Sequence, residues 1–118
     1  MLKKITTLGI FLISLASSAS VLAAACPPAA LPSSAAFCKS FKVSAECHCT
    51  SSGLPKSICG NMQQLYQRML ALFGSLERAC AYQQETPPQV CKDSWNCYRL
   101  GGKDSTGKLC SSTGKSCK

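Results

Sequence analysis

Cysteine is the residue type in this chain that can do the most chemistry. Ten cysteines occur in 118 residues, and two of them flank the single histidine in the run Cys47-His48-Cys49. Thiolates and imidazoles are common zinc ligands, and a cysteine beside a histidine is also the core of one type of nucleophilic pair. The spacing of these residues must therefore decide between metal binding, catalysis and disulfide formation.

The spacing argues against metal binding and against catalysis. A structural zinc site needs about four ligands, typically paired as C-x₂₋₄-C and H-x₃₋₅-H, and this chain has one histidine and no C-x-x-C pair. The missing C-x-x-C pair also argues against a thioredoxin-like redox role. No residue is placed to orient His48 as a catalytic base. We therefore expect no metal site and no cofactor.

The acidic residues do not form a catalytic pair either. A general acid and a general base would have to converge from positions scattered along the chain, and no motif brings them together. We expect these side chains to be solvated charges or partners of helix ends, and we expect no catalytic residues and no enzyme activity. The acids are Glu46, Glu77, Glu85, Asp93 and Asp104.

The first 25 residues are typical of a bacterial secretory signal peptide. Basic Lys3-Lys4 is followed by the apolar run 8–13 and then by small residues up to Ala25. This order is the pattern of a signal peptide, and the apolar run is shorter than the roughly 20 residues of a membrane-spanning helix. We therefore predict a signal peptide over 1–25 and a periplasmic or secreted domain over 26–118.

Cys26 has two possible roles at this boundary. It follows the small residues at once, as the lipidated cysteine of a bacterial lipoprotein does, and lipidation would bring the protein into contact with a membrane. However, Leu22 lies four residues before Cys26, whereas lipoprotein signals usually place leucine three before. Lipidation would also leave an odd number of cysteines. We favour a bridged Cys26 and keep the lipoprotein as the alternative.

The cysteines predict a disulfide scaffold. Ten cysteines in the region after residue 25 exceed the roughly 8–10% that marks such scaffolds, and an exported chain meets oxidising surroundings. Ten cysteines can close five bridges, but the sequence does not determine which ones pair. The expected half-cystines are Cys26, Cys38, Cys47, Cys49, Cys59, Cys80, Cys91, Cys97, Cys110 and Cys117.

The hydrophobic periodicity predicts a mainly α fold built on one long amphipathic helix. Between Ser57 and Gln84 the apolar residues recur at helical spacing. A continuous helix would separate Cys59 and Cys80 by roughly 30 Å, which is too far for a disulfide, so each must pair with a different segment. The apolar stripe comprises Ile58, Met62, Leu65, Tyr66, Met69, Phe73, Leu76 and Cys80.

Shorter elements flank this helix. Ser33-Ser34 can cap a short helix that continues to about Ala45. After the stop at 86–88, a second short helix or turn is expected over 89–98. The rest, rich in glycine, serine and lysine, is predicted to be a loop-rich tail. The whole is one small domain whose core needs its bridges.

The segment 93–99 is the best candidate for a binding surface. It concentrates Trp95, Tyr98 and Arg99, and these residue types dominate protein-binding hot spots. A bridge at Cys97 would hold them rigidly and lower the entropy cost of binding. The alternative is that Trp95 packs on the long helix as a core residue.

Basic residues gather after residue 90 and extend this candidate surface. Without Lys3 and Lys4 the chain carries eleven basic against five acidic side chains, a net charge near +6. Lys108 and Lys115 occupy equivalent positions in a repeat, 105–110 and 112–117, which predicts two similar tethered turns or a paired display of lysines. With Lys103 they would steer an acidic partner. An exported protein seldom meets nucleic acid, so none is expected as a partner.

The chain resembles small cysteine-rich exported proteins in its general build. The shared features are the signal peptide, the central helix, and the tail residues 95–98 with Gly101-Gly102. Some proteins of this kind accompany bacterial conjugation or type IV secretion systems. The resemblance implies an envelope interaction partner, and no functional residue is carried over from it.

The sequence thus predicts a non-enzymatic, disulfide-stabilised binding protein of the bacterial envelope, an accessory of a conjugation or secretion apparatus. Two alternatives draw on the same charge and bridges. One is a secreted cationic toxin or antimicrobial effector, although the predicted helix turns its apolar stripe inward rather than toward lipid. The other is a periplasmic inhibitor or immunity protein.

Overall fold

The structure is a computed structural model that describes residues 26–118. The predicted signal peptide, 1–25, lies outside the described residues. The described region is mainly helical and contains no β-strand, only an isolated bridge between Lys103 and Leu109. This confirms the mainly α, disulfide-rich class. The elements in chain order are α2 (Phe37–Ser51), α3 (Lys56–Cys59), α4 (Met62–Phe73), α5 (Leu76–Tyr82), α6 (Pro88–Leu100) and the 3₁₀ turn η1 (Cys110–Ser112).

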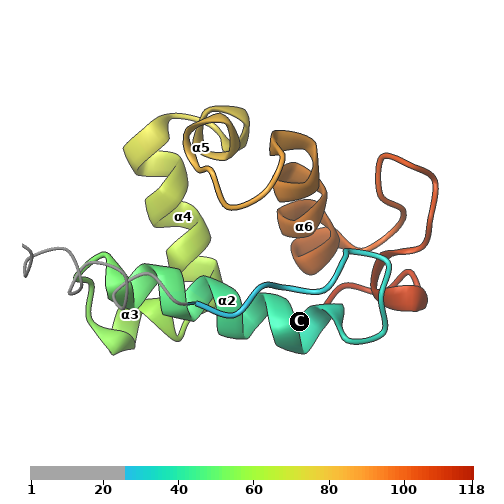
Figure 1. Ribbon diagram of the computed structural model, residues 1–118, viewed down its shortest axis with the longest axis horizontal. Helices are drawn as coiled ribbons and strands as arrows, with labels where there is room; N and C mark the ends of the chain where they lie inside the picture. Colours follow the sequence, from blue (N-terminus) through green and yellow to red (C-terminus); the bar gives the residue numbers. More distant parts are fainter. Residues whose placement is uncertain (1–25) are drawn as a thin grey trace, which may run out of the picture.

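Helix α2 is the base on which α4 and α6 stand (Figure 1). It was predicted to end near Ala45 but continues to Ser51. Phe37, Phe41 and Ala45 follow one another at four-residue spacing and face the core, as one stripe of an amphipathic helix must. Figure 1 shows α4 and α6 rising from α2, with α5 near their far ends.

The prediction of one continuous helix over 57–84 is wrong. The structure divides this segment into α3, α4 and α5. The first break lies at Gly60, after which the Asn61 side chain accepts a hydrogen bond from the backbone N–H of Gln64 at 3.0 Å. This is the geometry of an N-cap, so a new helix begins here.

The second break combines a helix stop with a helix start. Gly74 has φ +90°, a left-handed conformation that glycine adopts without steric cost, and its N–H donates to Leu70 O at 2.7 Å. Ser75 then caps α5 by accepting from the backbone N–H of Arg78 at 3.1 Å. The apolar stripe continues across this corner although the helix axis does not, which is why periodicity alone missed the break.

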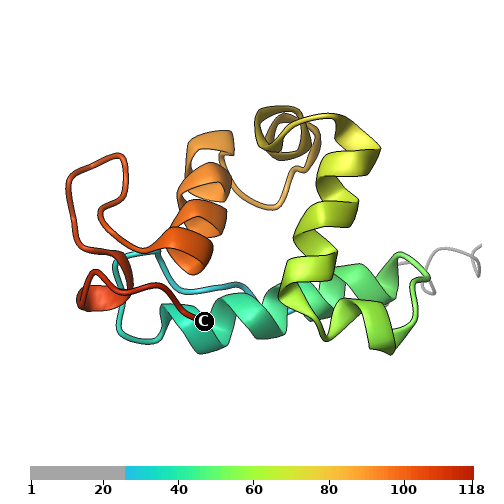
Figure 2. The same ribbon diagram turned by 180° about the vertical axis from the view of Figure 1, so that it is seen from behind.

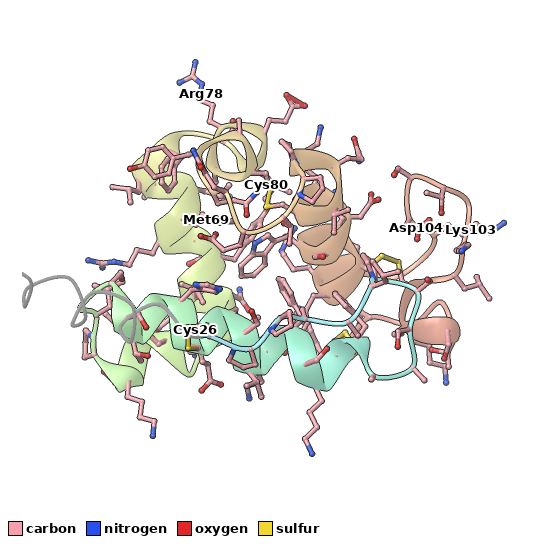
Figure 3. The ribbon with its side chains drawn as sticks, viewed as in Figure 1. Cys26, Met69, Arg78, Cys80, Lys103 and Asp104 are labelled. Carbon is pink, nitrogen blue, oxygen red and sulfur yellow. A yellow bond between two sulfur atoms is a disulfide. The ribbon has the colours of Figure 1, made fainter. Side chains whose placement is uncertain are left out.

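All ten cysteines form bridges, as expected for five pairs, and each bridge joins two different segments. Cys59 and Cys80 do not pair with each other, which confirms that expectation, but the breaks between α3, α4 and α5 remove the length argument behind it. Figure 3 shows Cys80 between α5 and α6. The pairs are Cys26–Cys47, Cys38–Cys117, Cys49–Cys59, Cys80–Cys91 and Cys97–Cys110.

The core lies where α2, α4, α5 and α6 meet, and sulfur makes up much of it. Its buried members come from five elements and include both sulfurs of the Cys97–Cys110 bridge. With so few large apolar side chains, the fold relies on covalent links between its segments. The buried cluster comprises Phe37, Met62, Cys80, Trp95, Cys97, Tyr98 and Cys110.

The tail after α6 folds back against the helices. The Cys117 N–H donates to Tyr98 O at 2.9 Å, and the Ser111 N–H donates to Pro32 O at 2.7 Å. Together with Cys38–Cys117 these bonds bring the last residues of the sequence beside α2 and α6, as the view from behind shows (Figure 2). The tail therefore contributes to the surface between the helices.

Candidate functional site

Trp95 and Tyr98 lie in the core rather than at the surface. Trp95 is 7% exposed and Tyr98 8% exposed. The Trp95 ring meets Phe41 edge-on, with centroids 4.9 Å apart, and lies 5.4 Å from the Tyr66 ring. The alternative role considered for Trp95, a core residue packed on the helices, describes its position in this structure.

Arg99 is the member of the predicted cluster that reaches the surface. Its guanidinium lies over the Tyr66 ring, 4.0 Å from the ring centroid. A cation above an aromatic face is attracted by the ring quadrupole, so Tyr66 holds Arg99 in position. The guanidinium has five N–H groups that can donate to a ligand.

Lys103, Lys108 and Lys115 are exposed on the tail and do not join Arg99 in one site. Figure 3 shows Lys103 extending away from the molecule. The loop that carries Lys103 and Lys108 is closed by Asp104, which accepts from the backbone N–H groups of Thr106 and Lys108 at 2.9 and 3.0 Å. The hydrogen bond from the Thr106 hydroxyl lowers the pKa of Asp104, so the loop is closed at neutral pH.

The two copies of the tail repeat are only partly equivalent. Gly107 and Gly114 both have positive φ, 88° and 79°, as expected for two glycine turns. The first copy is closed by Asp104, whereas the second copy begins at the last residue of η1 and its Gly114 O accepts from the Gly102 N–H at 2.7 Å. The turns are tethered by different bridges, Cys97–Cys110 and Cys38–Cys117, so they hold Lys108 and Lys115 at separate places.

A half-open groove lies between α2, α4, α6 and the tail. Its volume is about 540 Å³, within the range of ligand sites. Three of its residues are basic, and no Asp or Glu is among the described residues that line it. The lining residues are Lys42, Gly60, Asn61, Met62, Gln63, Tyr66, Gln67, Leu70, Tyr98, Arg99 and Lys118.

The groove has an apolar floor and a polar rim. Met62 and Tyr98, both nearly buried, form part of the floor. Burial, followed by the charge of Glu46, raises the pKa of Tyr98, so its phenol stays protonated at neutral pH. Lys42 and Arg99 lie on the rim from opposite helices. Such a surface suits a ligand with both apolar groups and negative charge.

Sequence reasoning missed most of this groove. It identified Tyr98 and Arg99, but it assigned Tyr66 to the apolar stripe and did not identify Lys42 or the glutamines of α4. A partial signal was present, because Gln63, Tyr66 and Gln67 recur at i, i+3 and i+4 and so share one face of a helix. The other walls come from segments far away in the sequence, which periodicity cannot bring together.

The run Cys47-His48-Cys49 has no thiolate to offer in this structure. Cys47 is bridged to Cys26, and Cys49 to Cys59. The two neighbouring cysteines thus fasten two different segments to α2. Within residues 26–118 no group of three or more His, Cys, Asp or Glu side chains is arranged to hold a metal ion.

Cys26 is engaged through the same atom that a lipid would use. Its Sγ is bonded to Cys47, and a lipid thioether would have to replace that bridge. Among the described residues no helix has the length and apolar character needed to cross a membrane.

Comparison with protein families, curated proteins and solved structures finds no match to this chain.

Proposed function

We propose that this protein is an exported, non-enzymatic, disulfide-stabilised binding protein that holds an acidic segment of an envelope protein in the groove. The observation that carries the proposal is the lining of the groove: Lys42, Arg99 and Lys118, with no Asp or Glu side chain among them. Five bridges suit an oxidising compartment. The resemblance to accessory proteins of conjugation and type IV secretion systems favours a partner in such an apparatus.

Reversing the charge of the groove tests this proposal. In a variant with Lys42→Glu and Arg99→Glu, an acidic ligand meets repulsion instead of attraction, and we expect its affinity to fall at least about tenfold. The measurement is quantitative capture of envelope proteins by the immobilised, oxidised protein at two salt concentrations. Capture by the parent protein should weaken at high salt because charges on the rim are screened.

A matched variant controls for the overall change in charge. Lys56 and Arg68 are exposed basic residues outside the groove, and their replacement by glutamate alters the net charge by the same amount. We expect this variant to capture the partner as the parent does. Equal losses in both variants would show that net charge, and not the groove, attracts the partner.

The cationic effector remains a second candidate because the corner between α4 and α5 exposes apolar side chains. Leu72 is 75% exposed and Tyr82 72% exposed. The inward-facing stripe that argued against lipid contact therefore does not account for every apolar residue of this region. Isolated exposed apolar residues are common on soluble proteins, so the groove is the better supported site.

Vesicle leakage separates the two candidates. For a binding protein we expect no dye release from vesicles of anionic phospholipid at micromolar protein. Rapid release that Leu72→Asp abolishes, and that the groove variant retains, would favour the effector.

A further inference from the structure

Two glutamine side chains line the groove without a hydrogen-bond partner among residues 26–118. Gln63 and Gln67 are both exposed on α4. In the part of the chain that the structure describes, neither side-chain amide takes part in a hydrogen bond. By contrast, the Gln83 amide bonds to Cys80 O and Thr86 O at 2.9 and 2.7 Å. The two groove amides are therefore free to bind a ligand.

The spacing of these amides matches an extended peptide. Residues four apart on an α-helix are separated by about 6 Å along its axis. Alternate residues of an extended chain are separated by about 6.6 Å. A peptide lying along α4 can thus present the backbone of one residue to Gln63 and that of the next but one to Gln67. Each amide supplies both a donor and an acceptor, as a peptide backbone requires.

Arg99 adds a charge beside these two amides. Its guanidinium lies 4.0 Å from the ring centroid of Tyr66, which precedes Gln67 by one residue on α4 and lines the same groove. A guanidinium held on an aromatic ring loses little further freedom when its edge binds a carboxylate with two hydrogen bonds. This placement favours an acidic side chain in the part of the bound segment that lies near Gln67.

The floor adds a preference for apolar groups. Met62 and Tyr98 are nearly buried beneath the groove, and Leu70, which also lines it, is half-buried. Since side chains of an extended peptide alternate in direction, those that face the floor would be apolar. Methionine adapts its shape to different apolar groups, so the floor tolerates several of them.

We propose that the groove binds an extended peptide segment in which acidic and apolar residues alternate, with its backbone on Gln63 and Gln67 and a carboxylate on Arg99. This inference rests on the proposed function and specifies the chemistry of the partner. A peptide is favoured over a phosphate or sulfate group because its backbone supplies both a donor and an acceptor to each glutamine amide, whereas the anionic group supplies acceptors only.

The test uses a capped hexapeptide, Leu-Glu-Leu-Glu-Leu-Glu, labelled for fluorescence anisotropy. Two further peptides carry N-methyl groups on either the odd or the even residues, which removes the backbone donors along one edge. One methylated peptide should bind about tenfold more weakly than the parent peptide, and the other should bind nearly as well. A peptide with lysine in place of glutamate should not bind.

Protein variants complete the test. With Gln63→Ala and Gln67→Ala together, we expect the parent peptide to bind about tenfold more weakly, as the loss of two modest hydrogen bonds predicts. On this variant the sensitive methylated peptide should show no additional loss, because both changes remove the same contacts. Arg99→Lys should weaken binding because lysine lacks the planar fork. Gln64→Ala, on the same helix but outside the groove, is the matched control and should have no effect.

The outcomes separate this inference from the proposed function. If backbone methylation and the double glutamine variant have no effect while Lys42→Glu with Arg99→Glu still abolishes partner capture, the extended-peptide inference is wrong and the acidic docking groove stands. Binding of a sulfated polysaccharide in place of all peptides would likewise overturn the inference. If charge reversal also leaves capture unchanged, both proposals fail.

Discussion

A variant with alanine at both Cys38 and Cys117 should be about 4 kcal/mol less stable than the parent protein. This bridge spans 79 residues, the longest separation of the five, and its removal releases the largest loop in the unfolded chain. The other bridges shorten the path between its ends to roughly 45 residues, which keeps the effect near 4 kcal/mol. Urea unfolding without reductant measures the loss, and the melting temperature should fall by about 20 °C.

The Cys26–Cys47 bridge provides the matched control. Its cysteines are half-buried like Cys38 and Cys117, but it spans 21 residues, so its removal should cost about 3 kcal/mol. A reversed order of the two losses would contradict the loop-closure explanation. Reduction of all five bridges should remove cooperative unfolding altogether, and an unchanged midpoint in reductant would show that the core suffices by itself.

Replacement of Trp95 by alanine should cost about 3–5 kcal/mol, the range for a large aromatic residue removed from a core. The ring is in contact with Phe41 of α2 and Tyr66 of α4, so a cavity would open where three helices meet. For a domain with a typical stability of about 5–15 kcal/mol, much of the protein could unfold. Thermal unfolding followed by circular dichroism measures this loss.

Two further substitutions on α6 separate the effect of burial from the effect of any change in this helix. Leu100 is 68% exposed, and Leu100→Ala should change stability by no more than about 0.5 kcal/mol. Trp95→Phe retains an aromatic ring and should cost roughly 1–2 kcal/mol while leaving partner capture intact. If a folded Trp95→Phe protein no longer captured the partner, Trp95 would have to contribute to binding as well as to the core.

The sequence predicted the scaffold better than its connections. Cysteine number and density indicate five bridges, and the structure has five. The pairing depends on which segments lie side by side, and eight cysteines already allow 105 pairings. The sequence allowed one statement about pairing, that Cys59 and Cys80 do not pair with each other. The structure confirms it, but the predicted reason, a continuous helix between the two cysteines, is wrong.

The helix breaks show how a periodic pattern can mislead. The stripe from Met62 to Cys80 keeps helical spacing because the residues of α4 and α5 face one core. Spacing alone does not report the direction of the helix axis. The local signals were present, a glycine followed by Asn61 and a glycine followed by Ser75, which are the residue types that end and begin helices. At Gly60 and Gly74 capping thus decided the structure.

The sequence predicted the chemical composition of the candidate site but not which residues come together to form it. A basic surface with aromatic residues near 95–99 was expected, and Arg99 belongs to the groove. Trp95 was predicted to be a binding anchor, but it is buried and its ring packs against Phe41 of α2. Lys42 and Arg99 line the same groove because α2 and α6 pack together through Phe41 and Trp95. These positions are more than fifty residues apart in the sequence, so no local pattern predicts the contact.

The Cys38–Cys117 bridge has a consequence for how the protein is made. Three other bridges lie wholly within the segment it encloses. If the chain enters an oxidising compartment amino end first, at the synthesis rate of roughly 5–20 residues per second, Cys38 arrives on the order of ten seconds before its partner. Cys47 and Cys49 are the thiols nearest to Cys38 in the sequence during that interval, and each belongs to another pair. The yield of native protein should therefore depend on a disulfide isomerase that corrects early pairings, more than on the oxidase that forms them.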